Sequence, residues 1–238
     1  VPVIKDVLKA MGIEIIEKEG LEADDLLGTI SCMCEEKEMD VSIISGDRDT
    51  LQLATEHVKI RIPKTRQGRT EVEDYNAADV VEKYGVTPKE FIDVKALMGD
   101  ASDNIPGVPG VGEKTATRII QQYQSIENAY EHADELKPPR ASKNLKEFWE
   151  QAKMSKVLAT IETHADIAFD VEKARLGELY TKEAYELFQR LQFKNMLGRF
   201  EAGISVNEIE KNFKEVTERA EIEKIFEEAR RAETAGAA

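Results

Sequence analysis

The chain has 238 residues, of which 41% are hydrophobic and 6% are aromatic. This composition is typical of a helix-rich globular protein, and because no apolar run is long enough to span a bilayer, we expect no membrane insertion. The formal net charge of -14 argues at first against nucleic-acid binding, since surfaces that bind phosphate are usually basic.

The amino-terminal part of the chain alternates predicted helices and strands. Ile4–Met11 has the spacing of a short amphipathic helix, and Ile13–Glu17 alternates apolar and charged residues like a strand. A helix over Glu22 to about Lys37 follows, and then a short apolar strand over Val41–Ser45. This strand, helix, strand order predicts a parallel sheet covered by helices, with ligands gathered beyond the carboxyl ends of the strands.

The middle of the chain predicts more strands and then a series of helices. His57–Ile62 is a strand candidate, Pro63–Gly68 a basic loop and Val72–Tyr75 an edge strand. A loop rich in glycine and proline over Gly99–Gly112 interrupts the helices, and a helical extension or a frayed terminus is expected from about Asn207. The predicted helices are Ala77–Tyr84, Pro88–Met98, Glu113–Gln124, Arg140–Thr160 and a helical pair over Thr181–Phe200.

Acidic residues gather at the ends of these predicted elements. Glu22–Asp25 (EADD) opens a helix, where the helix dipole favours acids, so this group alone is better explained by structure than by function. Asp47 and Asp49 (GDRD) directly follow the strand over Val41–Ser45, and a turn and a ligand site explain them equally well. The acidic excess is thus either a solvated surface or charge that divalent cations neutralise.

A third acidic group, Asp100 and Asp103 (GDASDN), closes a predicted helix, where capping is the ordinary role. The conjunction of three such groups, with no His or Cys beside them, favours a metal site. Oxygen ligands select hard cations such as Mg²⁺ or Mn²⁺ over zinc. Two such ions are a common device for phosphoryl transfer, in which one activates the attacking water and both stabilise the charge on the phosphate.

The segment Ile105–Ala116 (IPGVPGVGEKTA) carries a second motif. A Walker loop needs Lys directly after its last Gly, and Glu113 stands there instead, which excludes that motif. The glycine spacing predicts a hairpin between two helices, with the first amides of the second helix pointing at a phosphate. Lys114 and Arg118 add positive charge, so the hairpin is expected to hold a DNA backbone without reading its bases.

Three runs together resemble a known family: GLEADDLLGTI, SIISGDRDTLQL and YGVTPKEFIDVKALMGDASDNIPGVPGVGEKTATRII. They are similar to the 5′ nuclease domain of bacterial DNA polymerase I, within the flap endonuclease superfamily. The resemblance extends from Val1 to about Asp170, and more weakly through Glu186–Phe200. It implies an α/β fold with a parallel-sheet, PIN-like or resolvase-like nuclease core and an α-helical helix-hairpin-helix subdomain that binds DNA.

The resemblance also implies an activity and its ligands. The expected reaction is 5′-3′ exonuclease or flap endonuclease hydrolysis of DNA by two Mg²⁺ or Mn²⁺ ions in replication and repair, with a potassium ion at the helix-hairpin-helix. The implied ligands are Glu22 and Asp24, with Asp25 beside them, for the first metal, and Asp47, Asp49 and Asp103, with Asp100 close by, for the second. The residues expected to contact DNA are Gly107, Gly110, Gly112, Lys114, Thr115 and Arg118.

The chain departs from the family at its beginning. Family members open with a strand that bears an essential Asp, a second acidic strand and a basic helical arch, and the sequence contains none of these. Two expectations therefore stay open: an active 5′ nuclease, and a truncated, catalytically inactive module that binds branched or duplex DNA. A related RNA-cleaving nuclease is a third reading, against which the hairpin at Ile105–Ala116 counts.

Organisation and partners follow from the same features. We expect a partial nuclease core over residues 1–98, a helix-hairpin-helix subdomain with its following helices over 99–175, and a helical linker toward a further domain over 176–238. The expected partner is DNA with a 5′ flap, a nick or a plain duplex, bound by a monomer that is fused to a polymerase in the parent protein. Cys32 and Cys34 lie too close on a predicted helix for an ordinary disulfide, and no secretory signal is evident, so a cytoplasmic location is expected.

Overall fold

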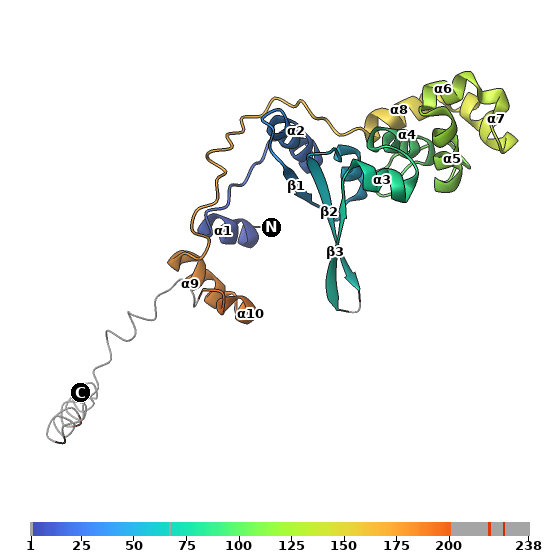
Figure 1. Cartoon of the computed structure of the whole chain (residues 1–238). Coiled ribbons are helices and arrows are strands. Elements are labelled where there is room, and N and C mark those ends of the chain that lie inside the picture. The colour runs from blue at the N-terminus through green and yellow to red at the C-terminus, as the bar shows by residue number, and fades with distance from the viewer. Residues whose placement is uncertain (1, 67, 201–218, 220–225, 227–238) are drawn as a thin grey trace. The chain divides into compact units, whose positions relative to one another are not determined.

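The computed structural model describes residues 2–66, 68–200, 219 and 226 (Figure 1). The chain divides into two compact units: a smaller unit of Val1–Ile15 with Glu172–Ala238, and a larger unit of Ile16–Val171. Apart from two residues, the helical tail predicted from about Asn207 lies outside the described residues. The domain boundaries expected from the sequence stay a prediction.

A three-stranded mixed sheet lies in the larger unit. Its strands stand in the order β1–β2–β3, with β1 parallel and β3 antiparallel to β2. Alternate residues of β2 face the core, and Val58, Ile60 and Ile62 are each at most 3% exposed. The strand bounds are Val41–Ile44 for β1, Val58–Arg66 for β2 and Arg69–Tyr75 for β3.

The strands correct two predictions made from the sequence. The predicted parallel sheet is confirmed for β1 and β2 and is wrong for β3, which returns along β2 as an antiparallel hairpin. The basic loop expected over Pro63–Gly68 is wrong as far as Arg66, since β2 continues through Pro63 and pairs with β3. Proline is tolerated there because β1 pairs only with Val58–Arg61, which leaves the distal part of β2 with a free edge.

The strand expected over Ile13–Glu17 is also wrong. These residues form no strand and connect the first helix, α1 (Pro2–Ala10), to the turn before α2 (Ala23–Glu35). Alternation of apolar and charged residues describes a segment that is half buried, but a strand also requires a neighbour whose backbone groups are free to pair. Ile13–Glu17 has the alternating pattern of a strand but pairs with no strand of the described residues.

Helix α4 (Pro88–Met98) is the central helix of the larger unit and packs against α5, α8 and η1. Its start follows the predicted chemistry, because Thr87 and Glu90 form a capping box around a proline at the first position. α2 packs against β1, and α3 packs against β3. The remaining bounds are Arg48–Leu53 for η1, Ala77–Tyr84 for α3, Glu113–Tyr123 for α5, Ile126–Glu131 for α6, Ala133–Glu135 for η2, Pro139–Glu147 for α7 and Trp149–Ala159 for α8.

Most of the predicted helices are confirmed to within a residue or two. The single helix expected over Arg140–Thr160 is wrong, because the chain turns at Phe148 (φ -108°, ψ 28°) and divides it into α7 and α8. The short helix α6 was not predicted, since its residues, Ile126–Glu131, are too few to show a helical period. Its one local signal is Ser125, whose side chain caps the helix through the amide of Asn128.

The smaller unit is helical in its described part. α1 packs against α9 (Lys182–Arg190), which is followed by α10 (Lys194–Leu197), so the helical pair expected over Thr181–Phe200 is confirmed. In the part of the chain that the structure describes, no helix is long and apolar enough to cross a membrane. The buried core of this unit consists of Val7, Ala184, Phe188 and Phe200.

Candidate metal centre

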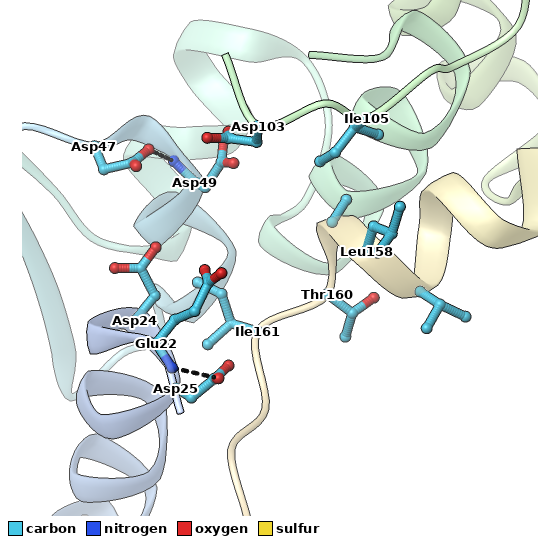
Figure 2. A pocket seen from close by; sticks show the side chains of 12 residues that line it. Glu22, Asp24, Asp25, Asp47, Asp49, Asp103, Ile105, Leu158, Thr160 and Ile161 are labelled. Carbon is cyan, nitrogen blue, oxygen red and sulfur yellow. Dashed lines mark hydrogen bonds between the residues drawn. The ribbon is translucent and has the colours of Figure 1, made fainter. Parts of the chain in front are cut away.

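The first acidic group lies at the start of α2, after a turn at Gly20 (φ 84°). Glu22 is the extended residue that caps the helix, and its amide donates a hydrogen bond of 3.2 Å to Oδ2 of Asp25. Oδ1 of Asp25 accepts the amide of Glu162 at 3.0 Å. Both oxygens of Asp25 thus accept backbone hydrogen bonds, and Asp25 and the half-buried Asp24 line the same pocket (Figure 2).

The second group directly follows β1. Asp47 caps η1, because its Oδ1 accepts the amide of Asp49 at 2.9 Å and its carbonyl accepts the Thr50 hydroxyl at 2.6 Å. These bonds fold a tight turn beyond the carboxyl end of a parallel strand, which is where ligands gather in α/β proteins. The turn brings both carboxylates to the same pocket as Asp24.

The third group follows α4. Gly99 ends the helix with φ 73°, and two backbone hydrogen bonds of 2.8 Å join Asp100 to Ile105 across a short loop. This loop brings Asp103 beside Asp49 (Figure 2). One carboxylate oxygen from each of Asp49, Asp100 and Asp103 lies within 4.8 Å of the others.

All three groups therefore converge on one place. A pocket of about 310 Å³ has carboxylates on one side and Ile105 with the end of α8 on the other (Figure 2). Asp100 does not line the pocket but belongs to the group of three carboxylates at its edge. The predicted ligands that line it are Glu22, Asp24, Asp25, Asp47, Asp49 and Asp103.

Lys95 of α4 is a charged residue of this site that sequence reasoning missed. It is buried, its Nζ lies 2.8 Å from Oδ1 of Asp49, and it also donates a hydrogen bond to Asp100. Burial opposes the charge of Lys95, but its hydrogen bonds to Asp100 and Asp49 outweigh burial and raise its pKa. The hydrogen bond from Lys95 and the amide of Ser102 lower the pKa of Asp100 to about 2. The missed signal is a lysine in the core-facing row of an amphipathic helix.

The pocket holds more negative charge than its protein surroundings neutralise. Burial raises the pKa of Asp24, and the charges of Asp47 and Asp49 raise it further. Burial also raises the pKa of Asp49, although Lys95 opposes that change. Among the described residues that line the pocket there is no His or Cys, so its donor atoms are oxygens. An oxygen donor set with excess negative charge fits a hard divalent cation.

The glycine loop between α4 and α5 is the predicted hairpin, and it packs tightly against α4 and α8. Gly107 (φ 60°) is buried, its amide donates to the Ser155 hydroxyl at 3.0 Å, and its carbonyl accepts Nε2 of Gln151 at 2.7 Å. Gly99 lies against it, since a Cβ on Gly99 would stand 2.9 Å from the Gly107 amide nitrogen. Gly107 therefore shapes the loop from inside.

The other residues expected to contact DNA lie at the start of α5. Gly112 is the N-cap residue of this helix and supplies no side-chain hydrogen bond to its first amides, although its carbonyl accepts the amides of Thr115 and Ala116 at 2.9 and 3.0 Å. Lys114 and Arg118 are exposed on the same helix, and Thr115 is half-buried between them. Gly110 takes φ 76° at the exposed tip of the loop.

Two family profiles match adjoining parts of the chain. The 5′-3′ exonuclease, N-terminal resolvase-like domain, matches residues 1–85, and the 5′-3′ exonuclease, C-terminal SAM fold, matches residues 86–182. The boundary between them falls between α3 and α4. The acidic pocket therefore takes carboxylates from both matched regions, since Asp49 lies in the first and Asp103 in the second.

Curated relatives agree with the profiles. DNA polymerase I of Bacillus subtilis (strain 168) is 44% identical over 198 residues, which cover 83% of this chain and 22% of the relative. DNA polymerase I of Bacillus caldotenax is 39% identical over 207 residues, which cover 87% of this chain and 23% of the relative. The chain thus spans about a fifth of the length of the relatives it matches.

Solved structures share the fold. T5 5′-exonuclease with bound zinc ions has a TM-score of 0.55 at 24% identity, covering 78% of this chain and 59% of the other. The catalytic core of Rad2 in complex with a DNA substrate has a TM-score of 0.57 at 15% identity, covering 84% and 68%. At these identities the likeness establishes the fold and leaves the chemistry to the residues of the pocket.

Proposed function

The chain belongs to the 5′-3′ exonuclease family, and on that premise we propose that it hydrolyses DNA phosphodiesters near 5′ ends or flap junctions during replication and repair. The observation that supports this function most is the convergence of acidic groups from α2, the β1–η1 turn and the α4–α5 loop on one pocket. We further propose that it is the nuclease part of a DNA polymerase I, that it acts as a monomer, and that it works in the cytoplasm, where the proposed DNA substrate lies.

Two divalent cations, Mg²⁺ or Mn²⁺, are the proposed cofactors. When bound, such ions supply an activated water and stabilise negative charge on the phosphate, so that no protein nucleophile is required. The proposed ligands are Glu22 and Asp24, with Asp25 beside them, for one ion, and Asp47, Asp49 and Asp103, with Asp100 close by, for the other.

The protein's own groups set the geometry of this centre. Lys95 favours the charged forms of Asp49 and Asp100 and orients both carboxylates, because it contacts both from a buried position, although burial still raises the pKa of Asp49. Asp25 ties the start of α2 to the segment after α8 through the amide of Glu162. Both contacts restrain the neighbouring carboxylates. Asp24 and Asp103 have no side-chain partner among the described contacts.

The start of α5 is the proposed DNA-backbone site. The amides that Gly112 leaves without a side-chain cap, together with the exposed Lys114 and Arg118, offer hydrogen-bond donors and positive charge to a phosphate. Gly112 allows a backbone to approach, because no described atom lies within 4 Å of where its Cβ would stand, whereas the Arg140 guanidinium lies against Gly110, with Nε 3.0 Å from that position. Gly110 and Thr115, which adds a hydroxyl, remain proposed DNA contacts, and a potassium ion is proposed at the same loop. Gly107 serves here by shaping the loop, because both of its backbone groups are used internally.

A second candidate function is a DNA-binding module that does not cut. The observation that favours it is that two proposed ligands already accept hydrogen bonds from the protein. Asp25 accepts backbone amides with both oxygens, and Asp100 accepts Lys95 and the amide of Ser102. If those contacts persist with metal present, the centre is incomplete. An RNA-cleaving nuclease is disfavoured because the glycine hairpin offers a site for a duplex backbone.

A labelled flap substrate distinguishes the two candidates. We expect cleavage by the wild-type chain with Mg²⁺ or Mn²⁺, no cleavage with EDTA, and a loss of about a hundredfold or more in rate for Asp103→Asn. Asp166→Asn is the matched control, since Asp166 is an exposed acid outside the pocket, and its rate should stay within about twofold of wild type. Binding of the flap with no product at any metal concentration would refute the nuclease and favour the module.

A further inference from the structure

The wall of the pocket that faces the carboxylates carries no ionisable side chain and is apolar except for Thr160. It is formed by Ile105 and by the end of α8 with the residues that follow, Val157–Ile161 (Figure 2). Ile105 and Ile161 are buried, but Val157 and Leu158 are 74% and 56% exposed. We call Val157 and Leu158 the apolar ledge of the pocket.

The position of the ledge distinguishes it from ordinary exposed apolar residues. Single exposed apolar side chains are common on soluble proteins, so exposure alone assigns no role. The ledge, however, lines the same pocket as the carboxylates, so an occupant large enough to fill that pocket can contact both walls. Met154, about one turn earlier on α8 and 52% exposed, does not line the pocket.

The two walls require different chemistry from one ligand. Carboxylates repel a phosphate, so the acidic wall binds it only through cations. The ledge carries no charge, and binding becomes more favourable when a flat, uncharged group covers its apolar surface and displaces water from it. A nucleotide meets both requirements, because its sugar carries an anionic phosphate and a base with an apolar face.

Resting on the proposed nuclease function, we propose that Val157 and Leu158 pack against the base of an unpaired nucleotide whose phosphate lies at the acidic wall. In a duplex the faces of a base are covered by its stacked neighbours, so the ledge can reach only a base that has left the stack. The ledge therefore favours DNA in which the nucleotide at the pocket is frayed or belongs to a flap. It determines specificity, and the carboxylates remain the groups that act on the phosphate.

The test compares a double variant that carries both Val157→Ser and Leu158→Ser with the control variant Met154→Ser. Met154 is an exposed apolar residue of the same helix that lies outside the pocket. Binding to flap DNA is measured by fluorescence anisotropy with Ca²⁺, on one substrate with a normal base at the junction nucleotide and one with an abasic site there. The double variant should bind the normal flap about fivefold more weakly than wild type, whereas Met154→Ser should bind like wild type. On the abasic flap all three chains should bind alike. Val157→Thr, which keeps the side-chain shape and replaces one methyl group with a hydroxyl, is the second variant if the double variant does not fold, with a loss of about twofold expected.

Each result decides between the proposals. Equal binding of the normal flap by wild type and double variant overturns the ledge, and so does an equal loss on normal and abasic flaps. Cleavage is then measured by replacing Ca²⁺ with Mg²⁺: binding without cleavage contradicts the nuclease function and leaves the ledge result standing. No binding of either DNA by the wild type overturns both.

Discussion

At the residue scale, the acidic centre is a balance between mutual repulsion of carboxylates and one buried cation. Lys95 compensates Asp49 and Asp100, while burial and neighbouring charges raise the pKa of Asp24 on the same acidic wall of the pocket. Because Lys95 contacts only two of these carboxylates, the acidic wall retains charge that it does not neutralise. This asymmetry is the physical reason for expecting a cation there.

Replacing Lys95 tests this balance. Lys95→Met should lower the free energy of unfolding by about 2 kcal/mol without divalent cations, because two partly buried carboxylates lose their partner. Added Mn²⁺ should restore more stability to the variant than to the wild type. Urea unfolding with and without Mn²⁺ measures both effects. Lys153→Met is the control, since its ion pair with Glu150 is exposed and should cost less than about 0.5 kcal/mol.

The ligand assignment is tested by calorimetry. Asp47→Asn and Asp103→Asn should each weaken Mn²⁺ binding by about tenfold or more, because an amide oxygen carries no charge to attract the ion. The exposed Asp166, changed to Asn, should leave the affinity unchanged. Wild-type affinity in both pocket variants would remove these two residues from the centre.

At the scale of elements, the α4–α5 loop depends on a close crossing of two glycines. Gly99 and Gly107 both adopt positive φ, and a side chain on either would meet the backbone of the other. This contact holds the loop that carries Asp103 and leads to the start of α5. The crossing therefore links the acidic pocket to the proposed DNA-backbone site.

Gly107→Ala should destabilise the fold by about 3 kcal/mol, since it adds a left-handed alanine and a steric clash with Gly99. Gly112→Ala is the matched control in the same loop, because its φ is -94° and no atom of the described residues lies within 4 Å of the added Cβ. Its unfolding free energy should change by less than about 1 kcal/mol. Equal midpoints for the two variants in urea unfolding would contradict the structural role of the crossing.

The β2–β3 hairpin predicts a pH dependence. Glu73 of β3 accepts hydrogen bonds from Lys64 at 2.7 Å, Lys83 at 2.8 Å and the Tyr75 hydroxyl, and these lower its pKa below the ordinary 4.5. A carboxylate whose pKa falls on folding stabilises the native state above its unfolded pKa, and that contribution is lost as the pH falls further. Glu73 should therefore stabilise the protein at neutral pH and progressively less below pH 4.5.

Thermal melting across pH measures this contribution. Glu73→Gln should have a lower Tm than wild type at pH 7, and the difference should shrink as the pH is lowered below about 4.5. Glu82→Gln is the control, because Glu82 is an exposed acid on α3, next to Lys83. A difference that stays constant with pH would mean that the glutamine acts through packing and not through charge.

At the scale of the whole molecule, the net charge of -14 opposes binding of a polyanion. Positive charge at the start of α5 is local, so cations at the acidic pocket should decide whether DNA stays bound. NaCl should weaken DNA binding through counterion release, whereas Mg²⁺ at equal ionic strength should strengthen it by filling the pocket. Anisotropy titrations compare the two salts. If Mg²⁺ weakens binding as NaCl does, the pocket does not recruit DNA through metal.

Much of the fold and of the acidic groups was predictable because the relevant signals are local. Thr87, Pro88 and Glu90 predict the start of α4 through capping, and the family resemblance on the EADD, GDRD and GDASDN runs predicts the nuclease fold that the comparisons show. The strand predictions were wrong where pairing with another strand determines the structure. Ile13–Glu17 has the alternation of a strand without a partner, and Pro63 lies in a strand because its neighbour on one edge ends early.

The acidic groups with their spacing, and the glycines of the loop, were evident from the sequence by itself, because caps, turns and periodicity depend on neighbours in the chain. Only the tertiary structure decided that six of the seven predicted carboxylates line one pocket and that Lys95 is buried against two of the seven. It also decided that Val157 and Leu158 form the apolar ledge opposite them. The reason is physical: repulsion, burial and compensation depend on distances through space, and α2, η1, α4 and α8 meet only when the chain folds.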